Sequence, residues 1–183
     1  MNYKEIFSDP LDFPTNKMHV EDRELPSVTN ELSVTLRLNV QRLDTNWQTI
    51  FQKGDNTTRT PSIWIWPNTT KLHPRFSTND EWNIGIEEIS IGLELNKWYH
   101  LGYTLSEPRK RMDIYLNGKW VGSKSIEHVH KEHVIFNKHP LHIGCEADEA
   151  GDAVFAGKMS NFRYYNRRLS ADEILEILIE TYQ

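Results

Sequence analysis

The decapeptide ELSVTLRLNV at Glu31–Val40 constrains the fold more than any other part of the chain. Apolar side chains occupy every second position from Leu32 to Val40, and polar side chains lie between them. A period of two places alternate residues on opposite faces of a β-strand. The decapeptide therefore predicts a long strand with one face against a core, as in an antiparallel sheet.

Further short segments have strand-like patterns and are separated by turn-rich sequence: 48–53, 62–66, 71–78, 97–105, 111–117, 119–126, 140–145 and 154–165. The absence of helical patterns between them argues against βαβ units and favours an antiparallel sandwich. Asn117-Gly118 favours a type I′ turn, so the segments on either side of it should form a hairpin. We expect an all-β fold of two antiparallel sheets.

The end of the chain has the signals of a short C-terminal helix. Ser170 and Glu173 have the spacing of a capping box, and Leu169 and Ile174 have the spacing of a hydrophobic staple. Apolar side chains at helical spacing should dock the helix on the sandwich: Ile174, Ile177 and Leu178.

The chain length of 183 residues fits one domain with a single core. We expect residues 1–14 to form an irregular N-terminal arm and residues 15–183 to form the domain. A net charge of −5 argues against a nucleic-acid partner, because phosphate binding needs a surplus of clustered Lys and Arg. The sequence holds no apolar window of membrane-spanning length, so we expect no membrane insertion.

Two features favour a cytoplasmic or other intracellular location. Cys145 is the only cysteine, so no intrachain disulfide can form, which is typical of a reducing compartment. The N-terminus also lacks the apolar core of a signal peptide. A signal peptide removed before residue 1 would reverse this expectation and place the protein outside the cell.

Three motifs resemble those of a known family: LNKWYH at Leu95–His100, YLNGK at Tyr115–Lys119, and GKMSNFRYY at Gly157–Tyr165 followed by LSADEI at Leu169–Ile174. They resemble the strand entry, the hairpin, and the closing strand and helix of laminin-G-like jelly-roll domains in the concanavalin A-like lectin/glucanase superfamily. The resemblance covers about residues 30–178. It implies two curved sheets with paired N- and C-terminal segments, and it leaves the function open because this fold hosts many functions.

A pair of tryptophans in SIWIWP gives the candidate ligand-binding site. Strand alternation in this segment and in LHPRF separates an apolar set, expected in the core, from an aromatic and basic set. The apolar set is Ile63, Ile65, Leu72 and Phe76, and the other set is Trp64, Trp66, His73 and Arg75. The second set could stack on sugar rings or anchor a protein partner. In the alternative, its tryptophans pack beneath the loop 79–90 against Trp82, which completes the candidate site.

Catalytic chemistry has little support in the sequence. A glycosidase of this fold needs two carboxyl groups that flank the bond at about 5–10 Å. Glu87 and Glu88 are adjacent, so on a strand they would point to opposite faces. His128 and His130 would share a face but lack a third zinc ligand at suitable spacing. We therefore expect a protein that is not an enzyme.

Calcium is the one cofactor that we consider, beside the expectation of none. The resemblance suggests it, because some laminin-G-like and pentraxin-like relatives bind calcium at a sheet rim. Calcium takes six to eight oxygen ligands, which acidic loops offer. The candidate ligands are Asp55, Asn56, Asp148 and Asp152. The alternative is a solvated acidic loop without a metal.

The sequence favours a non-catalytic binding or interaction module, whose partner is a glycan or a protein. The face that carries Trp64, Trp66, His73 and Arg75 is the expected contact surface. The alternative is an intracellular structural subunit of a larger assembly, with no glycan ligand. A glycoside hydrolase is the remote third interpretation.

Overall fold

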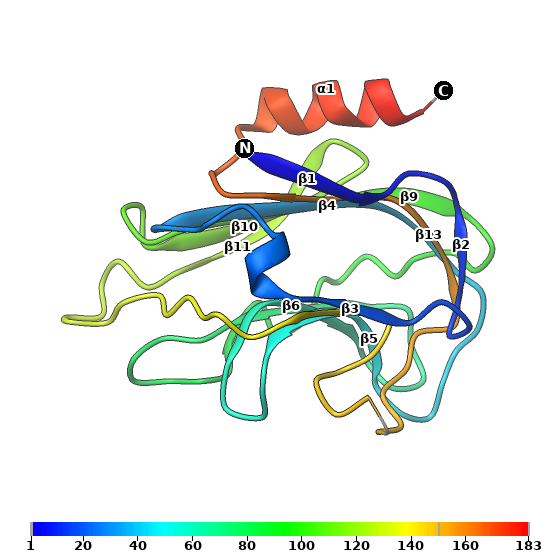
Figure 1. The fold of residues 1–183 in the computed structure, drawn as a ribbon, viewed down its shortest axis with the longest axis horizontal. Helices are drawn as coiled ribbons and strands as arrows, with labels where there is room; N and C mark the ends of the chain where they lie inside the picture. The colour runs from blue at the N-terminus through cyan, green and yellow to red at the C-terminus, as the bar shows by residue number, and fades with distance from the viewer. Residues whose placement is uncertain (1, 150, 183) are drawn as a thin grey trace.

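The computed structural model describes residues 2–149 and 151–182, and in it two antiparallel sheets stack face to face (Figure 1). The first sheet has the order β1 (Tyr3–Phe7), β13 (Gly157–Tyr165), β4 (Glu31–Val40), β9 (Trp98–Ser106), β10 (Arg111–Leu116) and β11 (Lys119–Ser125), with β2 (Leu11–Phe13) also paired to β13. The second has the order β3 (Met18–Val20), β12 (Leu141–Ile143), β5 (Gln48–Gly54), β6 (Arg59–Ile65), β7 (Leu72–Phe76) and β8 (Ile84–Gly85). The predicted all-β sandwich is confirmed.

Strand β4 is the predicted decapeptide, and it lies between β13 and β9. Its apolar side chains, from Leu32 to Val40, are at most 1% exposed between the sheets. The opposite face is also largely covered, which the alternation did not predict. The Ser33 hydroxyl donates to the Arg167 carbonyl (2.8 Å) and accepts from the Leu169 amide (2.9 Å), so the C-terminal segment covers this polar face.

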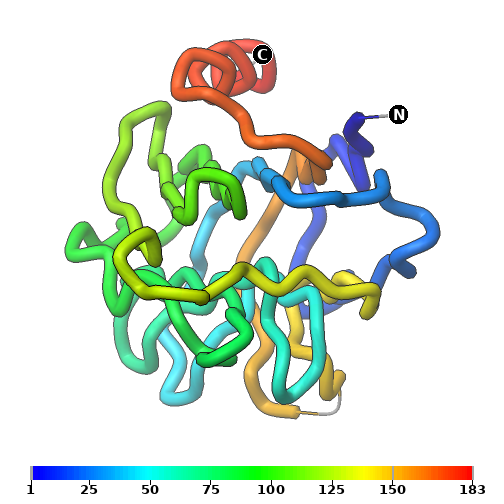
Figure 2. The backbone as a smooth tube through the Cα atoms, turned by 90° about the vertical axis from the view of Figure 1, so that its left-hand side faces the viewer, coloured from blue at the N-terminus to red at the C-terminus, as the bar shows by residue number. Residues whose placement is uncertain are grey.

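The N-terminal segment differs from the predicted irregular arm, because Tyr3–Phe7 and Leu11–Phe13 form strands β1 and β2. Both pair with β13, and the ladder satisfies their backbone groups. The Phe7 ring lies 5.8 Å from that of Phe162, and Phe13 is 5% exposed. The expectation of irregular structure is wrong for these strands. The pairing of N- and C-terminal segments that the resemblance implied is confirmed, and both ends lie on the side of the first sheet (Figure 2).

The core between the sheets includes aromatic contacts that join them. The Phe51 ring of β5 makes edge-to-face contacts with Tyr103 of β9 and Phe162 of β13, with ring centroids 5.9 Å and 5.7 Å apart. The Tyr103 hydroxyl donates to the carbonyl of Arg75 in β7 at 2.9 Å, which satisfies a buried polar group. The predicted core side chains are all unexposed: Ile63, Ile65, Leu72 and Phe76.

Two local predictions, the hairpin turn and the helix cap, are confirmed. Asn117 and Gly118 both have positive φ (51° and 77°), as a type I′ turn requires. Helix α1 (Ala171–Thr181) begins after Ser170, whose side chain accepts from the Glu173 amide, while Glu173 accepts from the Ser170 amide. A 3-10 turn, η1 (Asp22–Glu24), follows β3.

Helix α1 lies across the outer face of the first sheet (Figure 1). Ile174 is unexposed, and its methyl carbon lies only 3.0 Å from where a side chain on Gly102 of β9 would begin. Glycine at this position therefore lets the helix approach the sheet closely. Among the described residues, no helix is long and apolar enough to cross a membrane.

Truncation of the docked face of α1 should destabilise the whole domain. We expect Ile174→Ala to lower the free energy of unfolding by about 2–4 kcal/mol, because it leaves a cavity against the sheet. Ile179→Ala is the matched control, since Ile179 is 61% exposed; it should cost under about 0.5 kcal/mol. Urea denaturation of both variants measures the difference, and equal losses would contradict this account of docking.

Candidate functional site

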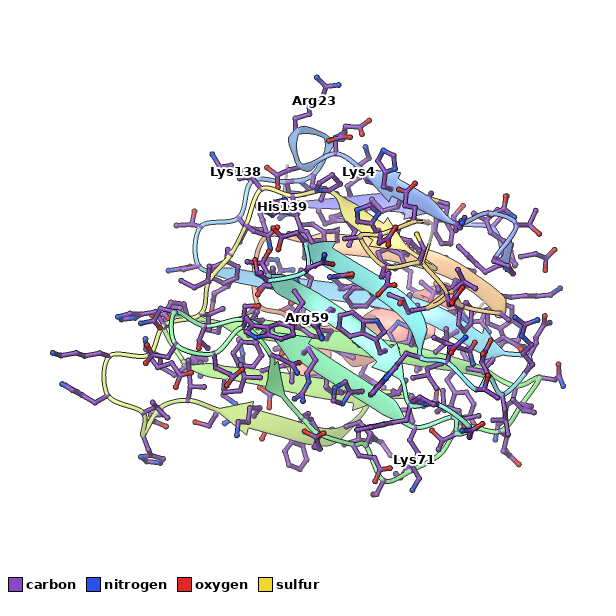
Figure 3. All side chains as sticks on the ribbon, turned by 90° about the horizontal axis from the view of Figure 1, so that it is seen from below. Lys4, Arg23, Arg59, Lys71, Lys138 and His139 are labelled. Atoms are coloured by element: carbon purple, nitrogen blue, oxygen red, sulfur yellow. The ribbon has the colours of Figure 1, made fainter. Side chains whose placement is uncertain are left out.

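The face of the second sheet that points away from the first carries a pocket of about 630 Å³. Figure 3 shows this face, with Arg59 near its middle and Lys71 and His139 toward its margins. The pocket is lined by two tryptophans, two basic side chains and two acidic ones, among others: Trp47, Trp64, Arg59, His73, Glu146 and Asp152. The pocket therefore combines aromatic surface with hydrogen-bonding groups of positive and negative charge.

Trp47 is supported by two aromatic rings. Its ring centroid lies 4.3 Å from that of Trp66 and 4.9 Å from that of His73. The indole N–H of Trp66 donates to the Glu87 carbonyl at 2.8 Å, which fixes this ring beneath the loop. Trp66 thus lies behind the pocket lining and holds Trp47 in position.

Arg59 lies between two further tryptophans. Its guanidinium carbon is 4.6 Å from the ring centroid of Trp64 and 4.4 Å from that of Trp82, both within cation–π range. Burial and, next to it, the nearby charge of Arg75 lower the pKa of Arg59 to about 10. The group stays protonated at neutral pH and gives the pocket wall a fixed cation.

His73 and Arg75 form a buried network with the loop after β8. The ring Nδ1 of His73 donates to the Glu87 carbonyl at 2.6 Å, and its Nε2 accepts from Nε of Arg75 at 2.7 Å. Arg75 also pairs with the Glu87 carboxylate at 3.0 Å. These contacts need a neutral imidazole with its proton on Nδ1. Both ring nitrogens are occupied, so His73 offers the pocket only its ring.

The structure places some of the predicted residues in the pocket wall and others behind or beside it. Trp64 and His73 line the pocket, Trp66 and Arg75 lie behind it, and Trp82, which is 47% exposed, flanks Arg59. All four residues of the outward set lie on the predicted face, yet Trp64, His73 and Arg75 are at most 6% exposed. Of the two tryptophans, Trp66 bonds to Glu87 in the loop 79–90, the loop that the packing alternative named. A ligand-binding role for these residues stays a prediction.

Sequence reasoning missed Trp47 and Arg59. Trp47 can be found only from the strand register: Gln48 pairs with Ile65, so Trp47 lies beside Trp66. Arg59 was missed because the predicted strand began at residue 62, whereas β6 begins three residues earlier. A β-bulge in this stretch disturbs the local alternation.

The four calcium candidates do not form a group of three converging carboxylates or histidines among the described residues. Asp55 closes a turn, since its Oδ1 accepts from the amides of Thr57 (2.8 Å) and Thr58 (2.9 Å). The Thr57 amide is the main cause that lowers the Asp55 pKa to about 2. Asn56 is exposed beside it, and Asp148 and Asp152 belong to a separate loop. Calcium binding stays a prediction.

Another polar group on the outer face of this sheet consists of His19 on β3, His142 on β12 and Glu149 in the loop that follows. Burial lowers the pKa of His142, and the nearby Glu149 carboxylate opposes this shift. The hydrogen bond with His19 lowers the pKa of Glu149. No sequence motif pointed to this group.

A family model described as the concanavalin A-like lectin/glucanases superfamily matches residues 14–175. The chain belongs to this superfamily. A search of curated proteins gives no significant match. The superfamily assignment agrees with the two-sheet architecture and the residues that carried the resemblance.

Solved structures share the fold of this superfamily member at low sequence identity. The binding domain of botulinum neurotoxin serotype D has a TM-score of 0.69 and 18% identity over 93% of this chain and 42% of that one. A structure of botulinum neurotoxin type C, described as entering cells through two ganglioside molecules, has a TM-score of 0.60 and 17% identity over 99% and 46%. A heptameric pentraxin from Limulus polyphemus has a TM-score of 0.62 and 20% identity over 97% and 82%. The chain thus spans less than half of either toxin structure.

The buried network makes a prediction about pH. Because burial lowers the His73 pKa to about 4, from about 6.5 when unfolded, the unfolded chain binds its proton first as pH falls. The stabilisation is complete above pH 6.5 and decreases toward pH 4, and His100 contributes in the same direction because burial lowers its pKa to about 4 as well.

Between about pH 7 and pH 5 the free energy of unfolding of the wild type should decrease, because the unfolded chain binds the His73 proton first. His73→Gln lacks this group, so we expect its free energy of unfolding to decrease by about 1–2 kcal/mol less than that of the wild type over the same pH range. His139→Gln, at a side chain 45% exposed, should behave as the wild type. Urea denaturation at each pH measures this difference, and an NMR titration of the His73 ring measures its pKa. A His73 ring that titrates near its ordinary value would refute the prediction.

Proposed function

We propose that the protein is a non-catalytic carbohydrate-binding module whose ligand occupies the pocket on the outer face of the second sheet. The observation that carries this proposal is the pairing of Trp47 and Trp64 with Arg59 in one open pocket of about 630 Å³. A pyranose ring has apolar C–H faces that pack on indole rings, while its hydroxyls need donors and acceptors. Membership of a lectin and glucanase superfamily is in keeping with such a ligand.

The polar groups of the pocket suit the hydroxyls of a sugar. Arg59 supplies donors, and the carboxylates of Glu146 and Asp152 supply acceptors. One cation and two carboxylates give no surplus of positive charge, so we expect an uncharged pyranose to bind better than an anionic one. The type C neurotoxin of the same fold interacts with gangliosides, which supports a glycan ligand but not its identity.

The proposal excludes hydrolysis, although Glu146 and Asp152 both line the pocket. These two carboxylates come from a loop, and Asp152 is exposed, whereas a catalytic pair needs rigid placement on either side of the bond. Burial, followed by the nearby Asp148, raises the pKa of Glu146. Because a raised pKa is also a property of a catalytic acid, a hydrolysis assay belongs in the test.

A panel of neutral and sialylated glycans tests the proposal. We expect the wild type to bind neutral glycans, and Trp47→Ala to weaken this binding by about tenfold, because aromatic stacking and buried area contribute about 1.4 kcal/mol or more. Trp120→Ala is the matched control, since Trp120 lies 57% exposed on β11 of the other sheet. It should leave binding unchanged. Circular dichroism of each variant confirms the fold.

Several results would overturn the proposal. Failure of the wild type to bind any glycan would leave the structural-subunit interpretation as the better one, and recovery of a stable protein partner from native cells would support it. Preference for sialylated over neutral glycans would contradict the proposed ligand class. Release of reducing sugar by the wild type, abolished in Glu146→Gln, would contradict the non-catalytic role.

A further inference from the structure

Strands β3 and β12 place two histidines side by side at the edge of the second sheet. His19 and His142 are directly paired in the antiparallel ladder, and their ring centroids are 5.7 Å apart. Leu141 and Ile143 point into the core, so His142 points to the outer face. The two imidazoles therefore converge on the same point above the sheet.

Glu149 reaches this point from the loop after β12. Its Oε1 lies 2.7 Å from Nδ1 of His19 and 3.2 Å from Nδ1 of His142. The Lys17 ammonium donates to the Glu149 carbonyl at 2.9 Å, and the Ala147 amide donates to Gln52 at 2.9 Å. These bonds hold the loop near the histidines without using the carboxylate.

His142 is the informative member of this group. The residue is only 7% exposed, and within the described part of the chain its Nδ1 has no partner that meets hydrogen-bond geometry. It faces Glu149 at ion-pair distance, but the ring nitrogen is not satisfied there. A buried polar atom without a hydrogen bond is costly, and such an atom calls for a specific explanation.

We propose that His19, His142 and Glu149 form a zinc site that ties the segment around Glu149 to the edge of the second sheet. The three ligand atoms lie within 4.8 Å of one another. Ligands about 2.0–2.1 Å from a tetrahedral zinc lie about 3.3 Å apart, close to the distance between Glu149 and His142. For zinc binding the His19 to Glu149 distance must lengthen from 2.7 Å, and the two imidazole nitrogens, which lie within 4.8 Å of each other, must come to about the same spacing. The side chains of His19 and Glu149 are about half exposed, which leaves them room for this adjustment.

The ligand types select zinc over calcium. Two imidazole nitrogens and one carboxylate suit zinc and its transition-metal neighbours, whereas calcium prefers six to eight oxygens. The second ring nitrogen of His19 lies 3.5 Å from the Glu21 carboxylate, so a small shift of this half-exposed ring would let it donate there, as metal-bound histidines usually do to a carboxylate. Solvent reaches the site beside the half-exposed His19 and Glu149, so water can complete the coordination.

Zinc titration of the full chain tests the site, with a chromogenic indicator as competitor. We expect one equivalent to bind, and His19→Ala and Glu149→Gln each to weaken binding by at least about tenfold, because even loss of an outer-shell partner costs that much. Both side chains are about half exposed, so these variants should stay folded. Zinc should also raise the thermal midpoint of the wild type, as any ligand of the native state does.

The double variant His128→Ala/His130→Ala is the matched control. It removes two exposed histidines from another loop and should leave zinc binding unchanged. The visible absorption of bound Co²⁺ gives an independent readout, and His142→Ala should lose the imidazole contribution to it. Failure of the wild type to bind zinc at micromolar concentrations would overturn the proposal, as would loss of binding only in the control. The glycan panel uses a different pocket, so either proposal can fail alone.

Discussion

Burial of Ile63 and Ile65 between the sheets determines where the candidate site lies. Because successive side chains of a strand point to opposite faces, an apolar contact for these residues forces Trp64 onto the outer face of β6. The same rule applied to β7 sends His73 and Arg75 to that face. Several large polar and aromatic groups thus gather on one surface as a consequence of core packing.

The gathered side chains are then largely buried by loops, and this burial imposes a second constraint. A buried imidazole beside a guanidinium is stable only if the ring is neutral and both nitrogens are hydrogen-bonded. The Glu87 carbonyl and Arg75 meet this need for His73, and the Glu87 carboxylate balances the Arg75 charge. The network gives Trp47 a rigid backing, so a ligand of the proposed kind would bind with little loss of side-chain entropy at this ring.

The sequence predicted the elements whose signals are local. Alternation in β4, Asn117-Gly118 in the hairpin and the capping box at Ser170 each lie within a few residues of the structure they specify. Strands β1 and β2 were missed because their stability comes from pairing with β13, more than 140 residues away. The pair of His19 and His142 was missed for the same reason, since only the register of β3 against β12 brings them together.

The loop after β12 connects the two proposed sites, and the core fixes its direction. Gly144 has a φ of 79°, and a side chain there would meet the Phe13 ring at 2.4 Å, so the chain can turn outward at this point only with glycine. The loop then presents Glu146 to the pocket and Glu149 to the histidines. A metal bound at Glu149 would restrict the backbone that carries Glu146.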